Sequence, residues 1–177
     1  GTDANGCSNT ADVTITVNDL PLVDISATDL EICVGESTDL YASGASTYVW
    51  STTETGLMIT VAPTTTTTYT VTGTDGNGCI NTASIQITVN PLPTVAIIPT
   101  ASQVCQGVST DLEVMGMASV EWSTSEIAAI ITVTPSVTTT YTVTATDNNG
   151  CSNTASILIL VDEVPVMAIN ATDQDVC

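Results

Sequence analysis

A segment of sixteen residues recurs three times at a fixed spacing. It reads TDANGCSNTADVTITV from Thr2, TDGNGCINTASIQITV from Thr74 and TDNNGCSNTASILILV from Thr146, so each copy begins 72 residues after the one before. A fixed period of this length indicates a chain built from copies of one small folding unit, because each copy must bury its apolar residues in the same way. The chain of 177 residues is therefore predicted to form tandem modules rather than one domain.

Three prolines at the same period, Pro21, Pro93 and Pro165, mark the joints between the expected modules. Each joint is short and lacks glycine, which favours a stiff head-to-tail rod. Because the first residues already fall inside a repeat, we expect the chain to be an excerpt of a longer protein. The expected parts are residues 1–21 as the C-terminal strand or strands of a preceding module, 22–93 and 94–165 as complete modules, and 166–177 as the first strand of a following module.

The apolar residues of each module follow the period of a β-strand. Val13, Ile15 and Val17 alternate with threonines, which is the pattern of a strand with one buried face. Other runs of this kind are equally short, rich in Thr, Val, Ile and Tyr, and bounded by Gly, Pro, Asn or Asp. No helical period is visible, so the pattern predicts an all-β sandwich of about seven strands per module.

The charge of the chain argues against several classes of partner. It carries 19 acidic residues and no Lys, Arg or His, for a net charge of −19. Nucleic-acid binding depends on Lys and Arg that neutralise phosphates, and attraction to anionic membranes depends on the same residues. No apolar run approaches the length needed to cross a bilayer. We therefore expect neither a nucleic-acid partner nor membrane insertion.

Six cysteines form two series at the same 72-residue period. Two cysteines per small module, in a chain without His and without close CxxC pairs, favour disulfides over a zinc site. This predicts an oxidising compartment. The two series are Cys7, Cys79 and Cys151, and Cys33, Cys105 and Cys177.

The motifs of a module follow a distinctive order: GESTDL, then a tryptophan, then TTTTTYTVT, then NGC with NTASI and ITV, then NPLP. This order resembles the tandem immunoglobulin-like and PKD-like repeats of giant secreted surface proteins of Bacteroidota, which include gliding-motility adhesins and other cargo of type IX secretion. The resemblance covers the whole chain. It implies immunoglobulin-like sandwiches at the bacterial cell surface, a role as filament, stalk or adhesin, and no catalytic residues.

The immunoglobulin pattern also suggests which residues form the core. A typical immunoglobulin domain joins strands B and F by a disulfide that packs on a tryptophan, and a conserved tyrosine stands near the start of strand F. Here aliphatic residues take the two disulfide positions in both modules. The predicted core residues are Leu40, Val71, Trp50 and Tyr69 in the first module and Leu112, Val143, Trp122 and Tyr141 in the second.

The expected topology bears on how the cysteines pair. Cys33 precedes a turn at one end of its module, whereas Cys79 begins the last strand at the other end, and a strand of about seven residues separates the two by roughly 20–25 Å. A disulfide needs Cα atoms within about 7 Å. An intermodule bond between Cys33 and Cys151 is therefore favoured, with Cys7, Cys79, Cys105 and Cys177 pairing to neighbouring modules. The intramodule pairs Cys33–Cys79 and Cys105–Cys151 remain the alternative, as do free thiols.

Two weaker site hypotheses remain. The turns at Asp3, Asp75 and Asp147 place Asp beside Asn and Gly; we interpret them as turns, although calcium binding is an alternative that would need more oxygen ligands. The segment Asn170–Thr172 matches the N-glycosylation sequon. No cofactor is expected.

The sequence favours a structural role over two others. One alternative is an array that binds glycan or protein through residues 52–57 and 124–129, and another is a non-catalytic spacer of a secreted polysaccharide-degrading enzyme. The apolar run at residues 156–161 breaks the alternation with threonine and suggests a strand covered on both faces. The expected partners are neighbouring modules of the same chain, with lateral self-association into a filament at such a strand.

Overall fold

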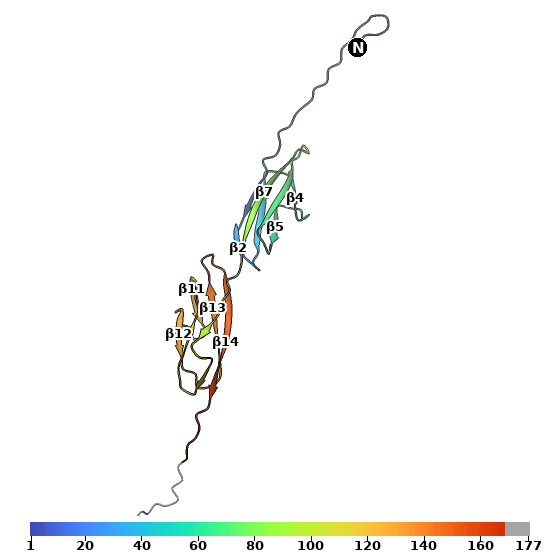
Figure 1. Ribbon diagram of the computed structural model, residues 1–177. Coiled ribbons are helices and arrows are strands. Elements are labelled where there is room, and N and C mark those ends of the chain that lie inside the picture. Colours follow the sequence, from blue (N-terminus) through green and yellow to red (C-terminus); the bar gives the residue numbers. More distant parts are fainter. Residues whose placement is uncertain (169–177) are drawn as a thin grey trace, which may run out of the picture. The chain divides into compact units, whose positions relative to one another are not determined.

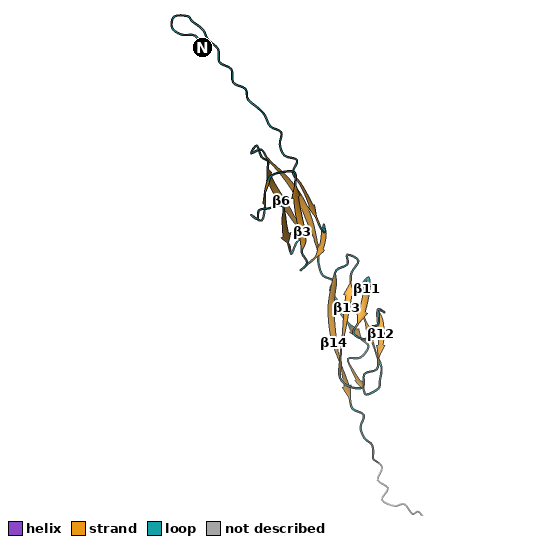
Figure 2. Cartoon of the chain, turned by 180° about the vertical axis from the view of Figure 1, so that it is seen from behind, coloured by secondary structure: helices purple, strands orange, loops and turns teal. Residues whose placement is uncertain are grey.

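The computed structural model describes residues 1–168 and divides the chain into two compact units, the first ending at Val89 and the second starting at Asn90 (Figure 1). All regular secondary-structure elements in this described range are β-strands (Figure 2), which confirms the all-β prediction. No helix there is long and apolar enough to cross a membrane. The predicted sequon at Asn170, Cys177 and most of the strand expected over 166–177 lie outside the described residues.

The first unit contains two sheets that face each other. One has the order β1-β3-β5 and the other the order β2-β7-β6-β4. The strands are β1 (Asp24–Ala27), β2 (Glu31–Cys33), β3 (Thr38–Ser43), β4 (Thr47–Trp50), β5 (Met58–Val61), β6 (Thr67–Thr74) and β7 (Ile80–Asn90).

The second unit repeats this arrangement with the orders β12-β10-β8 and β11-β13-β14-β9. Its pairs are antiparallel except that β9 runs parallel to the end of β14. The strands are β8 (Ile98–Pro99), β9 (Gln103–Cys105), β10 (Thr110–Glu113), β11 (Ser119–Trp122), β12 (Ile130–Val133), β13 (Thr139–Thr146) and β14 (Ser152–Asp162).

This strand order is that of an immunoglobulin-like sandwich. In immunoglobulin lettering, β3 and β5 are strands B and E of one sheet, while β4, β6 and β7 are C, F and G of the other. The first strand is divided, so that β1 lies in one sheet and β2 in the other. Each unit is therefore an immunoglobulin-like β-sandwich of seven strands, as the sequence predicts.

The alternating sequence explains the two faces of each sheet. Along β6, Tyr69 and Val71 are buried, and Val71 stands opposite Ala83 of β7. The residues between them point outward, where the hydroxyls of Thr70 and Ser84 lie 2.8 Å apart in a hydrogen bond. Threonine suits this outward face because its branched side chain fits an extended backbone and its hydroxyl pairs across strands.

The first repeat of the turn and strand departs from the sequence expectation. Residues 10–23 contain no strand, and Val13, Ile15 and Val17 are each more than three-quarters exposed. Of the equivalent residues in the second repeat, in contrast, Ile85 and Ile87 pair with β6. Alternation defines which face a strand would bury, but a strand forms only where a neighbour accepts its hydrogen bonds. The half-buried strand expected over residues 13–17 is therefore not formed.

Candidate functional site

The turn that presents Cys79 is built by one carboxylate. Oδ1 of Asp75 accepts hydrogen bonds from the backbone N–H of Asn77 at 2.8 Å and of Cys79 at 2.9 Å. The backbone N–H of Asp75 donates to the carbonyl of Cys79 at 3.0 Å, which closes the turn. Gly78 sits at φ 85°, a left-handed conformation that glycine adopts without steric cost. The aspartate therefore shapes the turn that places the cysteine at the start of β7.

The same turn occurs in all three repeats. Oδ1 of Asp147 accepts from Asn149 and Cys151 at 2.9 Å, and Oδ1 of Asp3 accepts from Asn5 and Cys7 at 2.9 Å. These oxygens are thus engaged by backbone donors, which accounts for the repeated aspartate as turn chemistry. Within the described residues, no group of three or more His, Cys, Asp or Glu side chains is arranged to hold a metal.

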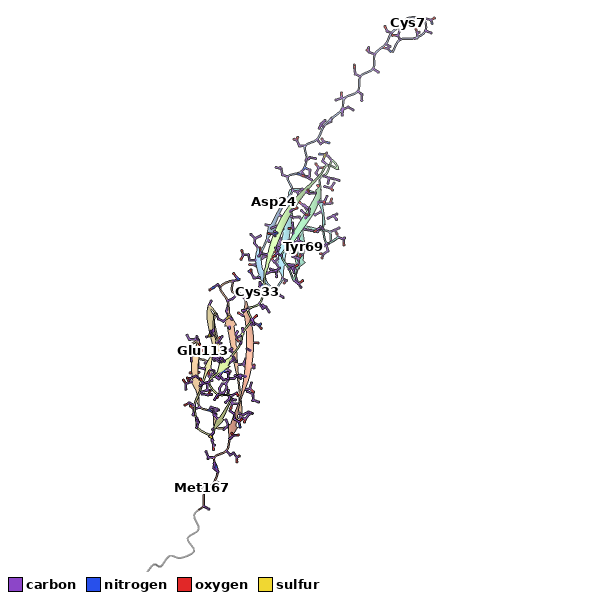
Figure 3. The ribbon with its side chains drawn as sticks, viewed as in Figure 1. Cys7, Asp24, Cys33, Tyr69, Glu113 and Met167 are labelled. Atoms are coloured by element: carbon purple, nitrogen blue, oxygen red, sulfur yellow. The ribbon has the colours of Figure 1, made fainter. Side chains whose placement is uncertain are left out.

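The second cysteine series lies on a different turn, after the short strands β2 and β9. The backbone N–H of Glu36 donates to the carbonyl of Cys33 at 3.0 Å, and Gly35 has φ 96°. In the second unit, Val108 donates to Cys105 at 3.0 Å across a left-handed glycine. Figure 3 shows Cys33 at one end of its sandwich, with Tyr69 well inside it.

The cysteines in the part of the chain that the structure describes are in two different states. Cys33 and Cys151 are disulfide-bonded, and both are buried. Cys7, Cys79 and Cys105 are free thiols, and Cys7 and Cys105 are exposed. The alternative intramodule pairs Cys33–Cys79 and Cys105–Cys151 are therefore wrong, because each would require one of these free cysteines.

The strand register gives the physical reason. Cys105 pairs with Asp162 at the end of β14, whereas Cys151 directly precedes Ser152 at its beginning. The two cysteines thus lie at opposite ends of one strand, roughly 33 Å apart at about 3.3 Å per residue. A disulfide reaches across only about 7 Å between Cα atoms.

The eight residues predicted for the core are all buried. Leu40, Val71, Leu112 and Val143 have no exposed surface. Each tryptophan is also tied to a loop: Nε1 of Trp50 donates to the carbonyl of Gly56 at 3.0 Å. The other predicted positions, Trp122, Tyr69 and Tyr141, belong to the same two buried clusters.

Burial affects the chemistry of the two core tyrosines. It raises the pKa of the Tyr69 and Tyr141 phenols above the ordinary value of 10.0, because a phenolate inside the sandwich would lose its hydration. Both phenols are therefore held in the neutral form that suits an apolar interior.

The loop proposed as a binding element, residues 52–57, is held mainly by its own contacts. The backbone N–H of Trp50 donates to the carbonyl of Glu54 at 2.9 Å, and the Thr52 hydroxyl donates to the Glu54 carboxylate at 2.8 Å. Thr53 has φ 72°, which is unusual for a β-branched residue. The second unit repeats these features around Glu126. The loop is therefore held to the buried Trp50 by hydrogen bonds.

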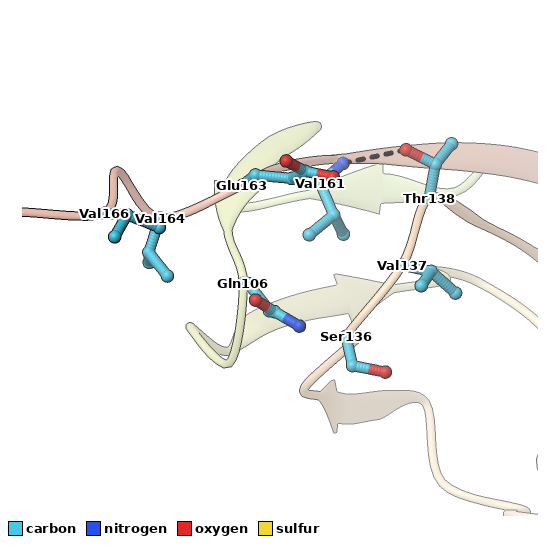
Figure 4. Close-up of a pocket in the computed structure, with 8 residues that line it drawn as sticks. All are labelled: Gln106, Ser136, Val137, Thr138, Val161, Glu163, Val164 and Val166. Atoms are coloured by element: carbon cyan, nitrogen blue, oxygen red, sulfur yellow. Dashed lines mark hydrogen bonds between the residues drawn. The ribbon is translucent and has the colours of Figure 1, made fainter.

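A hollow of about 480 Å³ opens on the second unit where the chain leaves β14 (Figure 4). Glu163 supplies the one carboxylate in its wall, next to Val164. The hydrogen bond drawn there runs from the backbone N–H of Val161 to Oγ1 of Thr138 at 3.0 Å. The first unit has the same bond at Val89. Because this bond joins strand ends in both units, we assign it to the fold rather than to a ligand site.

The apolar run at residues 156–161 is not buried throughout. Ile159 is fully buried, whereas Leu158 and Leu160 are nearly half exposed.

Sequence reasoning missed Asn81 and Asn153. Their side-chain amides donate hydrogen bonds to the carbonyls of Pro21 and Pro93, where the chain enters each module. Their recurrence with those prolines at the 72-residue period was the available signal.

No protein-family model matches the chain, and no curated protein sequence matches it. Among solved structures it is similar to murine CEACAM1b, with 14% identity, 80% of this chain and 100% of that chain covered, and a TM-score of 0.37. It is also similar to the N-terminal eight Ig domains of DSCAM (14% identity, 81% and 25% covered, TM-score 0.43). A third is a 1.5-MDa bacterial ice-binding adhesin (14% identity, 83% and 67% covered, TM-score 0.40). The assignment to the immunoglobulin-like fold rests on the strand order described above.

Proposed function

We propose that this chain is a structural segment of an extracellular filament, stalk or adhesin on a bacterial surface, of the kind its motifs resemble in Bacteroidota. In this role a disulfide between Cys33 and Cys151 fastens one module to the next. The observation that carries the proposal is the division of the cysteines: these two are disulfide-bonded, whereas the partners that each would have within its own module are free thiols. Disulfides persist in oxidising compartments, which fits a location outside the cell.

Such a bond would place most of both sandwiches inside one covalent loop. Residues 34–150 lie between the two cysteines, from the turn after β2 to the turn before β14. A force applied to the ends of the chain would therefore pass through the disulfide and bypass most of the folded strands. This is the property that a load-bearing stalk requires.

The surface composition supports a spacer role. The net charge of −19 with no cationic side chain makes the modules repel one another and stay soluble. The outward faces of the long strands carry threonine and serine hydroxyls that bond to one another, as Thr70 does to Ser84 and Thr142 to Ser156. Hydroxyl groups on these faces therefore form hydrogen bonds with one another.

Single-molecule pulling of the chain from its two ends tests this proposal. With the disulfide intact, full extension should fall short of that of the reduced chain by on the order of 400 Å, because the residues between the cysteines stay hidden. A Cys33→Ser/Cys151→Ser variant should extend like the reduced chain, and a Cys79→Ser/Cys105→Ser variant like the oxidised wild type. Equal extension of oxidised and reduced wild type would contradict the proposal.

A further inference from the structure

The two free cysteines of the sandwiches are the repeat equivalents of the two bonded ones. Cys105 follows Cys33 by one period, and Cys79 precedes Cys151 by one period. Among the described residues, therefore, each cysteine series has one disulfide-bonded member, Cys151 or Cys33, and its other members are thiols: Cys7 and Cys79 in one series and Cys105 in the other. The two bonded cysteines show that both positions can take part in a disulfide.

Each free cysteine stands on a turn that is closed by the same backbone hydrogen bond as in its bonded equivalent. The hydrogen bonds from the backbone N–H to the turn aspartate are 2.9 Å at Cys79 and 2.9 Å at Cys151. The bond that closes the other turn is 3.0 Å at Cys105 and 3.0 Å at Cys33. The turns that carry the two thiols are thus already formed, although the bond from the Cys33 N–H to the Glu36 carboxylate has no counterpart at Cys105, where Val108 takes the place of the glutamate. A turn that is already formed loses little conformational entropy when its thiol pairs.

We propose that Cys105 of one copy of this chain forms a disulfide with Cys79 of a second copy, so that copies join head to tail. The inference rests on the proposed Cys33–Cys151 bond, because it repeats that bond between chains. A contact that joins two different patches can repeat from copy to copy, and it generates a linear polymer where its rotation does not close a ring. The partner of Cys105, and likewise that of Cys79, is therefore a second copy of this chain.

The oxidant is a small disulfide such as oxidised glutathione. The thiolate of one cysteine attacks it, forms a mixed disulfide and releases one glutathione thiol. The thiolate of the other cysteine then attacks the protein sulfur of this mixed disulfide and releases the second glutathione. Two protein thiols are oxidised to one disulfide, and one glutathione disulfide is reduced to two thiols.

Two matched full-length variants test the pairing. The first, Cys7→Ser/Cys79→Ser/Cys177→Ser, keeps Cys105, and the second, Cys7→Ser/Cys105→Ser/Cys177→Ser, keeps Cys79. Distinguished by an affinity tag, they are mixed in a glutathione redox buffer, quenched by alkylation and separated without reductant. The heterodimer should exceed both homodimers, and its peptide map should contain Cys105 joined to Cys79. A random distribution of dimers, or no dimer, overturns the inference.

A third variant separates the turn from the sandwich. Cys79→Ser/Cys105→Ser/Cys177→Ser keeps Cys7, which stands on the same turn but is followed by no strand. Mixed with the Cys105 variant, it should give fewer heterodimers than the Cys79 variant; an equal yield would mean that any exposed thiol suffices and would overturn the inference. The Cys33–Cys151 peptide in each unmixed variant tests the proposed function separately, so the two failures are distinguishable.

Discussion

The side-chain amide of Asn81 donates a hydrogen bond to the main-chain carbonyl of Pro21 at 2.9 Å, across 60 positions of sequence. Asn153 makes the same bond to Pro93 at 2.9 Å. Each asparagine lies just after a cysteine turn, at the start of the long last strand, and each proline precedes the first strand of the same sandwich. The bond therefore ties the entrance of a module to its final strand.

Replacing Asn153 by alanine should lower the free energy of unfolding by about 1–2 kcal/mol, because the partly buried Pro93 carbonyl loses its donor. Chemical denaturation measures the change. Asn9→Ala is the matched control: Asn9 occupies the same motif position and is exposed, and its side-chain oxygen accepts a hydrogen bond from the N–H of its neighbour Thr10. Equal effects of the two substitutions would refute the structural role of the amide.

Gly73 of β6 is a position where a side chain does not fit. A Cβ there would lie 2.6 Å from Cγ2 of Val23 and 2.8 Å from Cβ of Ala45. Gly73→Ala should therefore destabilise the first unit by about 1–3 kcal/mol, the usual cost of overpacking. The second unit carries Ala145 at the equivalent position, so the constraint belongs to the first unit alone.

The Gly73→Ala effect can be assigned to its unit by fluorescence. Each sandwich contains one tryptophan, so in a Trp122→Phe background Trp50 alone reports unfolding of the first unit. Gly76→Ala is the control, because a Cβ at Gly76 meets no atom within 4 Å. If the two alanine variants unfold alike, the predicted clash is absent.

Alkaline pH should destabilise both sandwiches through their buried tyrosines. The pKa of Tyr69 and Tyr141 is raised in the folded state, so the unfolded chain ionises first. Stability is thus fully retained below the ordinary value of 10.0 and falls as pH rises from there through the raised value. Tyr69→Phe and Tyr141→Phe should flatten this fall in denaturation measured against pH.

Loss of the proposed Cys33–Cys151 disulfide should reduce the free energy of unfolding as well as alter the extension of the chain. Closing a loop of this length restricts the unfolded chain, and removing such a bond costs roughly 2–5 kcal/mol. Cys33→Ser/Cys151→Ser should therefore melt below the wild type in thermal scans without reductant, and reductant should bring the wild type down to the variant. Cys105→Ser, which removes a free thiol, should melt with the wild type. A double variant as stable as the wild type would argue that the bond carries no constraint.

Cysteine pairing shows where sequence reasoning stopped. The period placed the cysteines in two series, but both an intermodule and an intramodule pairing were compatible with it. The intramodule pairing of Cys105 with Cys151 is excluded by the end of β14 that each cysteine occupies, and those positions follow from the parallel pairing of β9 with residues 160–162. Such a pairing joins residues far apart in the chain, which a local pattern does not encode.

The core residues could be predicted from the sequence because burial follows the alternation of apolar residues and the order of the motifs. Leu40 and Val71 could be placed at facing positions once the strands were ordered. The sequence could not predict why position 73 is glycine while the equivalent position 145 is alanine, because this depends on how closely Val23 and Ala45 approach β6.

The first repeat distinguishes what the local sequence determines from what tertiary structure determines. The turn at Asp3 has the hydrogen bonds of the other turns, with Cys7 N–H at 2.9 Å from the carboxylate, although no strand follows it. All of its contacts lie within five residues, so the sequence by itself determined it. The alternating residues 13–17 match the pattern of β7 but form no strand. Only tertiary structure decided that, because a strand takes its hydrogen bonds from a distant neighbour.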